Sequence, residues 1–258
     1  MGKKVVLCNC RGNIVDVTVL HAISSYIQNI DIELITVSDL CGICVTKKAE
    51  TQTLFSTQDE LLIIACHPRA VRLLLQNIGV DIETKQFSFL NFRENRNDHF
   101  FNTIQSFAND TSGKSSINIE SDPAWPAWYP IIDNIRCSTC GQCADFCLFG
   151  VYEKSEGHVN VVNPKGCKNN CPACARICPQ AAIVFPKYSE GGAISGSEIN
   201  DEITELHRQQ QDINTILGSD IYAALEQRQS KRRSIIKTDA MDKALEEREN
   251  ALSKKINQ

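Results

Sequence analysis

The chain has 258 residues, 42% of them hydrophobic and 22% charged, which is typical of a soluble globular protein with one large or two modest domains. A net charge of −4 gives no general attraction to nucleic acid or an anionic membrane surface, and no apolar run approaches the length of about 18 residues that crosses a bilayer. Thirteen cysteines behind a start that lacks a secretory signal indicate metal or redox chemistry in a reducing cell. We therefore expect a cytoplasmic protein with no nucleic-acid partner and no direct membrane insertion.

Residues 1–108 alternate short strand-like runs with helix-like patterns. Strand-length apolar or β-branched runs occupy residues 4–8, 32–37, 61–66 and 87–92. Apolar residues at helical spacing predict helices over 14–28, after Pro68 and over 99–107. This rhythm favours an α/β domain with a mostly parallel sheet and helices on its faces.

A linker is predicted over residues 109–130. Its first part is polar, and its second part is rich in proline and holds both tryptophans, Trp125 and Trp128. The aromatic residues either pack against the domain that follows or form a docking surface for a partner.

Eight cysteines form two runs within residues 131–186. The first run reads C-x2-C-x2-C-x3-C and comprises Cys137, Cys140, Cys143 and Cys147. The second reads C-x3-C-x2-C-x3-C-P and comprises Cys167, Cys171, Cys174 and Cys178. Such runs wrap around iron–sulfur cubanes, whereas zinc sites usually use two pairs separated by a longer loop, and a disulfide framework needs an oxidising compartment. The runs therefore predict two 4Fe-4S clusters and electron transfer.

In a two-cluster arrangement, the fourth cysteine of each run binds the cluster of the other run. The first cluster would take Cys137, Cys140, Cys143 and Cys178, and the second would take Cys147, Cys167, Cys171 and Cys174. The two runs also mark an internal repeat, which predicts two similar halves in a unit that depends on its metal for stability.

Five further cysteines, Cys8, Cys10, Cys41, Cys44 and Cys66, follow or end the first three predicted strands. Ligands of open parallel sheets gather outside the carboxyl ends of the strands, so these cysteines are expected to meet at one edge. We predict a third cluster there, bound by Cys10, Cys41, Cys44 and Cys66, with Cys8 as a further candidate. A redox dithiol of Cys41 and Cys44, or inert cysteines, are the alternatives. Basic residues expected near this edge to offset the charge are Arg11, Lys47, Lys48 and Arg69.

Residues 187–258 are predicted to form a helical tail after a glycine-containing loop. Apolar residues at helical spacing form one stripe, Ile199, Ile203, Leu206, Ile213 and Leu217, and a weaker one, Met241, Leu245, Leu252 and Ile256. Such a tail would pack on the body of the protein or on another protein.

Residues 131–186 resemble bacterial-type ferredoxins with two 4Fe-4S clusters, through both cysteine runs, the Cys178-Pro179 pair and the repeat. The resemblance implies an α+β two-cluster ferredoxin-like domain. The chain departs from the pattern at Lys168-Asn169-Asn170, which is one residue longer than usual, and at Leu148, which replaces a proline.

Residues 1–108 resemble the amino-terminal domain of the large, flavin-containing subunit of heterodisulfide reductase. The resemblance rests on residues 8–14, the cysteines after the second strand and residues 64–69. In that family the domain carries an additional cluster. No G-x-G-x-x-G motif follows a strand, so no flavin is expected in this chain.

These features together predict a non-catalytic electron-transfer component of an oxidoreductase. Its partners would be a redox partner protein or oxidoreductase subunits. The alternative function is a reductase that acts on a disulfide or another small substrate at the N-terminal cysteines, and a third is a cluster-based sensor. His67, next to Cys66, is predicted to be a packing or surface residue rather than a ligand.

Overall fold

The computed structural model describes residues 2–11, 14–83, 86–93, 98–109, 111, 113–155, 157–197, 223 and 226. The chain divides into two compact units, Met1–Gln210 and Gln211–Gln258, and the described residues belong to the first unit except for Ala223 and Glu226. Both apolar stripes predicted for the tail lie outside the described residues.

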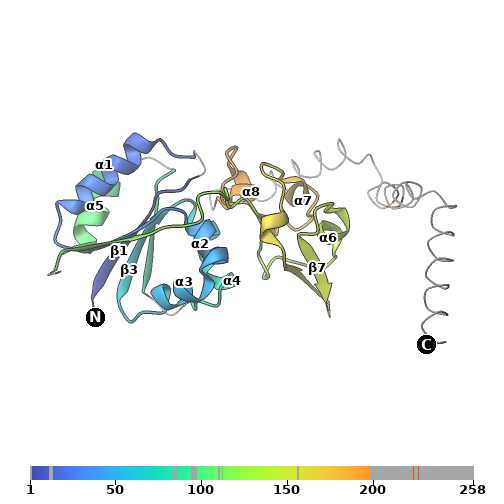
Figure 1. Cartoon of the computed structure of the whole chain (residues 1–258), viewed down its shortest axis with the longest axis horizontal. Helices are drawn as coiled ribbons and strands as arrows, with labels where there is room; N and C mark the ends of the chain where they lie inside the picture. Colours follow the sequence, from blue (N-terminus) through green and yellow to red (C-terminus); the bar gives the residue numbers. More distant parts are fainter. Residues whose placement is uncertain are drawn as a thin grey trace, which may run out of the picture. The chain divides into compact units, whose positions relative to one another are not determined.

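The N-terminal half is built on a parallel sheet with the strand order β4-β3-β1-β2-β5 (Figure 1). Its strands are β1 (Lys3–Cys8), β2 (Glu33–Val37), β3 (Glu60–Ala65), β4 (Phe87–Asn91) and β5 (Ser115–Ile119). The predicted α/β class and the four predicted strands are confirmed.

The fifth strand corrects the prediction of a linker without regular structure over this segment. β5 pairs in parallel with β2, and Ile117 lies opposite Ile35. The strand is at the edge of the sheet and largely exposed, so it needs few apolar residues. Its sequence therefore lacks the apolar run that marks the four other strands.

The connections between strands place helices on both faces of the sheet. Helices α1 and α5 lie on one face and α3 and α4 on the other (Figure 1). The helices are α1 (Val17–Gln28), α2 (Leu40–Thr46), α3 (Lys48–Phe55), α4 (Pro68–Asn77) and α5 (Asp98–Phe107). No helix in the described part of the chain is both long and apolar enough to cross a membrane.

Local sequence explains where α4 begins and ends. Pro68 occupies its first turn, where the missing N–H costs nothing, and Gly79 follows its end with a φ of +88°. The amide of Val80 then donates to the Leu75 carbonyl and closes the end of the helix. Both signals were predicted from the sequence.

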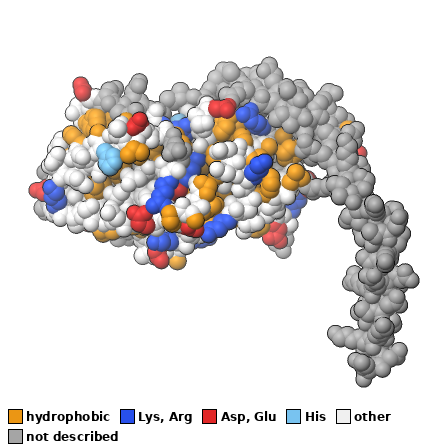
Figure 2. All heavy atoms as spheres, turned by 45° about the horizontal axis from the view of Figure 1, so that its top comes forward, with side chains coloured by type: hydrophobic (Ala, Val, Ile, Leu, Met, Phe, Trp, Pro, Cys, Tyr) orange, Lys and Arg blue, Asp and Glu red, His pale blue; other side chains and the backbone are white. Residues whose placement is uncertain are grey.

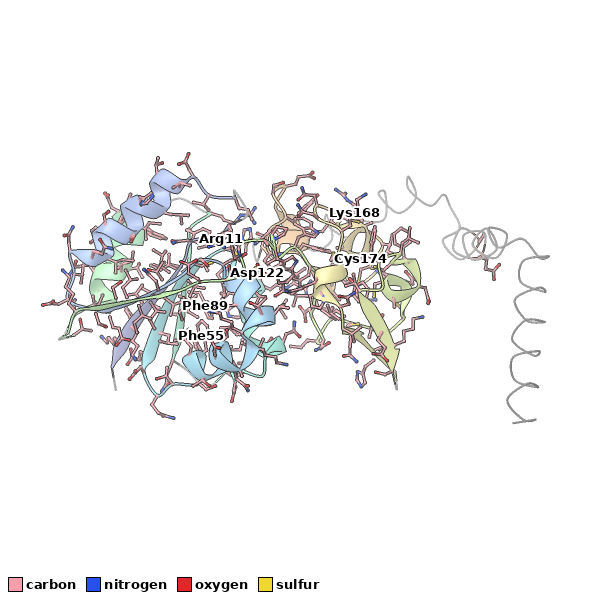
Figure 3. The ribbon with its side chains drawn as sticks, viewed as in Figure 1. Arg11, Phe55, Phe89, Asp122, Lys168 and Cys174 are labelled. Atoms are coloured by element: carbon pink, nitrogen blue, oxygen red, sulfur yellow. The ribbon has the colours of Figure 1, made fainter. Side chains whose placement is uncertain are left out.

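Because helices cover both faces, the central strands are buried on both sides. Val5, Val6 and Leu7 of β1 are almost completely buried, as are most residues of β3. Phe55 and Phe89 lie among the side chains around the sheet, whereas Cys174 lies outside this domain (Figure 3).

The cysteine runs belong to a smaller module with two antiparallel strand pairs. Strand β6 pairs with β9, and β7 pairs with β8. The elements are β6 (Ile131–Ile132), α6 (Gln142–Phe146), β7 (Tyr152–Ser155), β8 (His158–Val161), a 3-10 turn (Pro164–Gly166), α7 (Ala173–Arg176), β9 (Ile183–Val184) and α8 (Gly192–Ser195). Trp128 stacks on Phe185 in its small core, which favours packing over partner docking for this tryptophan.

Buried polar contacts join the module to the sheet domain. Arg69, at the start of α4, forms an ion pair of 2.8 Å with Asp133 after β6. The same guanidinium approaches the carbonyls of Ala181 and Ala193 at 3.4 Å. Gly196 packs so closely on Ala70 that a Cβ at Gly196 would lie 2.8 Å from the Ala70 Cβ. The module is therefore fixed to the N-terminal end of α4.

Candidate metal centres

The first candidate centre is a small cavity in the module. Four cysteines of both runs line it, namely Cys137, Cys140, Cys143 and Cys178. Burial raises the pKa of Cys143 to about 12, and Cys178 contributes most among the neighbouring thiols. Gln142 also lines the cavity, and its Oε1 is buried with no hydrogen-bond partner among the described residues. Four soft sulfur donors around a partly open, mostly apolar cavity suit an iron–sulfur cubane.

The second candidate centre brings Cys147 of the first run to three cysteines of the second run. Burial raises the pKa of Cys167 to about 12, with added contributions from Cys171 and Cys147. Burial also raises the pKa of Cys174, and Cys167, Cys143 of the first centre and Cys147 contribute to this shift. The Tyr152 hydroxyl lies 3.0 Å from the Cys174 sulfur, to which it can donate a hydrogen bond. Cys147 of the first run therefore lies near Cys167 and Cys174 of the second run.

The extra residue of the second run is accommodated by backbone conformation. Asn170 adopts a left-handed conformation with a φ of 58° directly before Cys171. Asparagine tolerates this region better than most residues. Upstream, the amide of Gly166 donates to Asn163 Oδ1 at 3.1 Å and holds the turn that leads to Cys167. The longer spacing is thus taken up between Cys167 and Cys171, before α7 begins and carries Cys174.

The third candidate centre lies at the carboxyl edge of the parallel sheet and is called the edge site here. It comprises Cys8, Cys10, Cys41 and Cys66, all of them buried. Strand β1 lies between β2 and β3, so the chain leaves β1 toward one edge of the sheet and later crosses to the other side of β1 to form β3. Open α/β sheets usually bind ligands at such a switch in strand order. Cys10 has a φ of 41°, which turns the chain sharply out of β1.

Electrostatic effects show that these four thiols are neighbours. Burial raises the pKa of Cys8 well above its usual value, and Cys10 and Cys66 raise it further. Burial likewise raises the pKa of Cys41, followed by Asp39, with smaller contributions from Cys66 and Cys10. For Cys66, burial and Cys10 raise the pKa to about 12. The Leu40 amide also donates a hydrogen bond of 3.4 Å to the Cys8 sulfur.

Cys44 has different surroundings from the other four N-terminal cysteines. It lines a separate cavity together with Lys48, Tyr129 and Asn160. Burial raises its pKa to about 12, and Asp39 raises it further, as it does for the edge-site thiols Cys8, Cys41 and Cys66, but no cysteine contributes to the shift of Cys44. The geometry therefore favours Cys8 over Cys44 as the fourth member of the edge site, in contrast to the order of preference suggested by the sequence.

The cations near the edge site also differ from those expected. Arg11 forms an ion pair of 2.7 Å with Glu120, and Arg69 binds Asp133. Arg93 and Lys187 instead act on the cysteines. Arg93 lowers the pKa of Cys66, and Lys187 lowers that of Cys41, although burial dominates both shifts.

Sequence reasoning missed these two cations because no motif marks them. Lys187 follows β9, late in the sequence of the module, and Arg93 follows β4. Only the tertiary fold brings these two residues close to the cysteines. His67, by contrast, behaves as a packing residue. It is buried, its Nδ1 lies 3.1 Å from Asn91 Nδ2, and burial lowers its pKa to about 4.

Among the described residues, no three histidine, cysteine, aspartate or glutamate side chains converge closely enough for a single metal ion.

One known protein shows similarity to part of this chain. A segment of 61 residues is 46% identical to an uncharacterized ferredoxin from Methanocaldococcus jannaschii. The chain contains a ferredoxin-like segment. The match covers 23% of this chain and 42% of the relative, so the chain spans less than half of that ferredoxin.

No protein-family model matches the chain. No solved structure matches it either. The ferredoxin similarity supports iron–sulfur chemistry and electron transfer, whereas the resemblance of residues 1–108 to heterodisulfide reductase remains a prediction.

Proposed function

We propose that this protein transfers electrons through two ferredoxin-type 4Fe-4S clusters and a third cluster at the edge site, as a carrier or as a subunit of a larger redox complex. The observation that carries the proposal is the cavity lined by Cys137, Cys140, Cys143 and Cys178. These residues come from both runs, as crossed ligation requires. The similarity to a ferredoxin supports the same chemistry.

Bound clusters would supply one-electron chemistry, and the chain supplies the surroundings that set their potentials. Hydrogen bonds to the sulfurs, burial and nearby charge are the protein's means of control. At the second centre the Tyr152 hydroxyl contacts Cys174, and at the first the Ala182 amide donates to the Cys178 sulfur at 3.4 Å. Such contacts stabilise a reduced cluster, which carries one more negative charge.

A redox partner would approach the exposed side of the module. Leu148 and Phe149, directly after Cys147, expose 65% and 42% of their surface, and Ile135 before Cys137 exposes 92%. On the face drawn in Figure 2, apolar side chains are interspersed with basic and acidic ones. This mixture suits a transient electron-transfer contact, which buries little area. The partner itself is an oxidoreductase or another carrier in this proposal.

The edge site suits electron transfer better than reduction of a bound substrate. Its four cysteines each expose 8% of their surface or less, and Lys187 and Arg93 are close enough to three of them, Cys10, Cys41 and Cys66, for their charges to interact. A disulfide substrate would need direct access to a sulfur or to iron. Turnover of a disulfide by purified protein with an artificial electron donor would favour that alternative.

Quantification of iron and acid-labile sulfide in anaerobically purified protein tests the proposal. Two ferredoxin-type clusters and one edge cluster hold about 12 iron atoms, four for each cubane. Electron paramagnetic resonance of the reduced protein should show interacting 4Fe-4S signals. A fully loaded protein with about eight iron atoms would keep the ferredoxin function but remove the third cluster. A protein with zinc in place of iron would remove the proposal.

A further inference from the structure

Two cations of separate origin, half-buried Arg93 and buried Lys187, lie near the edge site. Arg93 follows β4 of the sheet domain, and its strongest charge interactions with thiols are with Cys66 and Cys10. Lys187 follows β9 of the smaller module, and its interactions with thiols are with Cys41 and Cys10. The site therefore receives one positive charge from each domain.

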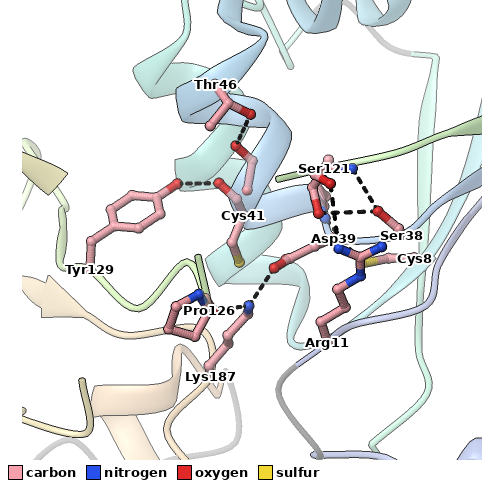
Figure 4. A network of polar contacts seen from close by, with 12 residues as sticks. Cys8, Arg11, Ser38, Asp39, Cys41, Thr46, Ser121, Pro126, Tyr129 and Lys187 are labelled. Atoms are coloured by element: carbon pink, nitrogen blue, oxygen red, sulfur yellow. Dashed lines mark hydrogen bonds and ion pairs between the residues drawn. The ribbon is translucent and has the colours of Figure 1, made fainter. Parts of the chain in front are cut away.

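Lys187 is held in place by the buried carboxylate of Asp39 and by the carbonyl of Pro126. Its ammonium lies 2.5 Å from Asp39 Oδ2 and also donates to the Pro126 carbonyl (Figure 4). The exposed fractions of the Lys187 and Asp39 side chains are 4% and 1%. Asp39 lies two residues before Cys41, so the pair is adjacent to the sulfurs.

The ion pair is difficult to explain by stability alone. Desolvation of two buried charges commonly offsets their attraction, and apolar residues of similar volume often stabilise a protein as well or better. Asp39 Oδ1 is buried without a well-formed hydrogen bond among the described residues, although the amides of Gly42 and Cys41 lie close enough to lower the pKa of the carboxyl. A role in the charge balance of the neighbouring thiolates accounts for both features.

The backbone around Lys187 is held over the edge site as well. The Arg93 guanidinium donates to the carbonyls of Pro186 at 3.4 Å, Tyr188 at 3.0 Å and Ser189 at 3.3 Å. Residues 186–189, called the closing segment here, thus connect to one cation through their carbonyls and carry the other as Lys187. The module reaches the sheet domain here as a fixed part of the edge site.

We propose that Lys187, delivered by the closing segment, is a positioning residue of the edge site that raises the reduction potential of the cluster held by Cys8, Cys10, Cys41 and Cys66. The inference rests on the proposed third cluster. One electron from a low-potential donor adds one negative charge to the cluster, and no bond to Lys187 forms or breaks. The fixed ammonium stabilises that added charge, because unit charges interact strongly in a poorly solvated site.

The test compares full-length variants by redox titration, with the edge-cluster signal followed by electron paramagnetic resonance. Lys187→Met removes the charge and keeps most of the volume. We expect the equilibrium between reduced and oxidised cluster to shift at least about tenfold toward the oxidised form. For a one-electron couple this corresponds to a reduction potential that is about 59 mV lower. Lys187→Arg should restore most of the potential. Lys165→Met, which changes an exposed lysine of the same module, should leave it unchanged.

Asp39→Asn provides a test of opposite sign that does not depend on the Lys187 variants. It removes a negative charge beside Cys41, so the potential should rise. Iron content separates the possible failures. Wild-type protein with about eight iron atoms refutes the third cluster and this inference together. The inference fails if the wild-type protein holds about 12 iron atoms but the potential of the edge cluster in both Lys187→Met and Asp39→Asn equals that of the wild type. That result leaves the proposed function intact.

Discussion

Trp128 and Tyr129 are neighbours in the chain, yet their side chains donate hydrogen bonds to two different cysteine sites. Trp128 Nε1 lies 3.5 Å from the carbonyl oxygen of Cys171, in the second centre. The Tyr129 hydroxyl lies 2.9 Å from the carbonyl oxygen of Cys41, in the edge site. Consecutive Cα atoms are only about 3.8 Å apart, so one peptide unit ties the two sites together.

This link fixes the spacing between the sites. Both aromatic side chains are buried, Trp128 against Phe185 and Tyr129 against Trp125, at ring centroid distances of 5.1 and 5.6 Å. Together with the Arg69–Asp133 pair, they leave little freedom for the module to move on the sheet domain. Electron transfer between the edge site and the module would then occur over a constant distance.

Removal of the Tyr129 hydroxyl should weaken this attachment modestly. Tyr129→Phe leaves the ring in place but loses the hydrogen bond to Cys41, so we expect the free energy of unfolding to fall by about 1 kcal/mol. Anaerobic denaturant unfolding followed by circular dichroism measures the change. Tyr26→Phe is the matched control, because its longer contact of 3.5 Å to the Phe101 carbonyl should contribute less. Equal effects of the two variants would contradict a special role for Tyr129.

Crossed ligation can be tested by non-additivity. If Cys178 and Cys143 bind the same cluster, Cys178→Ser and Cys143→Ser should give the same spectrum and the same loss of iron. The double variant should then lose no more iron than either single variant. The pairing of Cys178→Ser with Cys174→Ser should instead remove both clusters of the module. Iron analysis and paramagnetic resonance distinguish these results, and the reverse pattern would show uncrossed ligation.

The edge site offers a pair of matched variants on neighbouring cysteines. Cys8→Ser should remove the third cluster and about four of about 12 iron atoms, because Cys8 interacts with Cys10 and Cys66. Cys44→Ser should keep all of them, since Cys44 lines a different cavity. Loss of iron in Cys44→Ser with retention in Cys8→Ser would restore the ligand set suggested by the sequence. Iron content per folded protein is the measurement.

The Arg69–Asp133 pair should make a large contribution to the attachment of the module. Arg69→Met leaves the Asp133 carboxylate, 9% exposed, without its closest cation, and breaking a buried pair in this way costs about 3–5 kcal/mol. Glu120→Gln is the control. It breaks an exposed pair with Arg11 and should cost less than about 1 kcal/mol. Thermal unfolding of both variants measures the difference. Similar unfolding midpoints would show that the remaining partners of Asp133, the Ile135 amide and Arg136, compensate for the loss of Arg69.

The sheet could be predicted because its strands are buried on both faces and so form continuous apolar runs. β5 escaped prediction because an exposed edge strand needs no such run. The edge cysteines were found by topology, since each follows or ends a strand. Asp39, Arg93 and Lys187 could not be found in that way, because their contacts depend on how the module packs against the sheet domain. The choice between Cys8 and Cys44 likewise depends on which side of α2 faces the sheet.

The position of Lys187 in the sequence has a consequence for biosynthesis. All five strands of the sheet and the edge cysteines have been synthesised by Ile119, whereas the closing segment begins at Pro186, 67 residues later. Domains fold as units from the N-terminus during synthesis. The sheet would thus present its cysteines to the iron–sulfur delivery machinery before the ribosome has produced the segment that closes over them. A cluster could enter an open site and then be enclosed by the last part of the module to emerge.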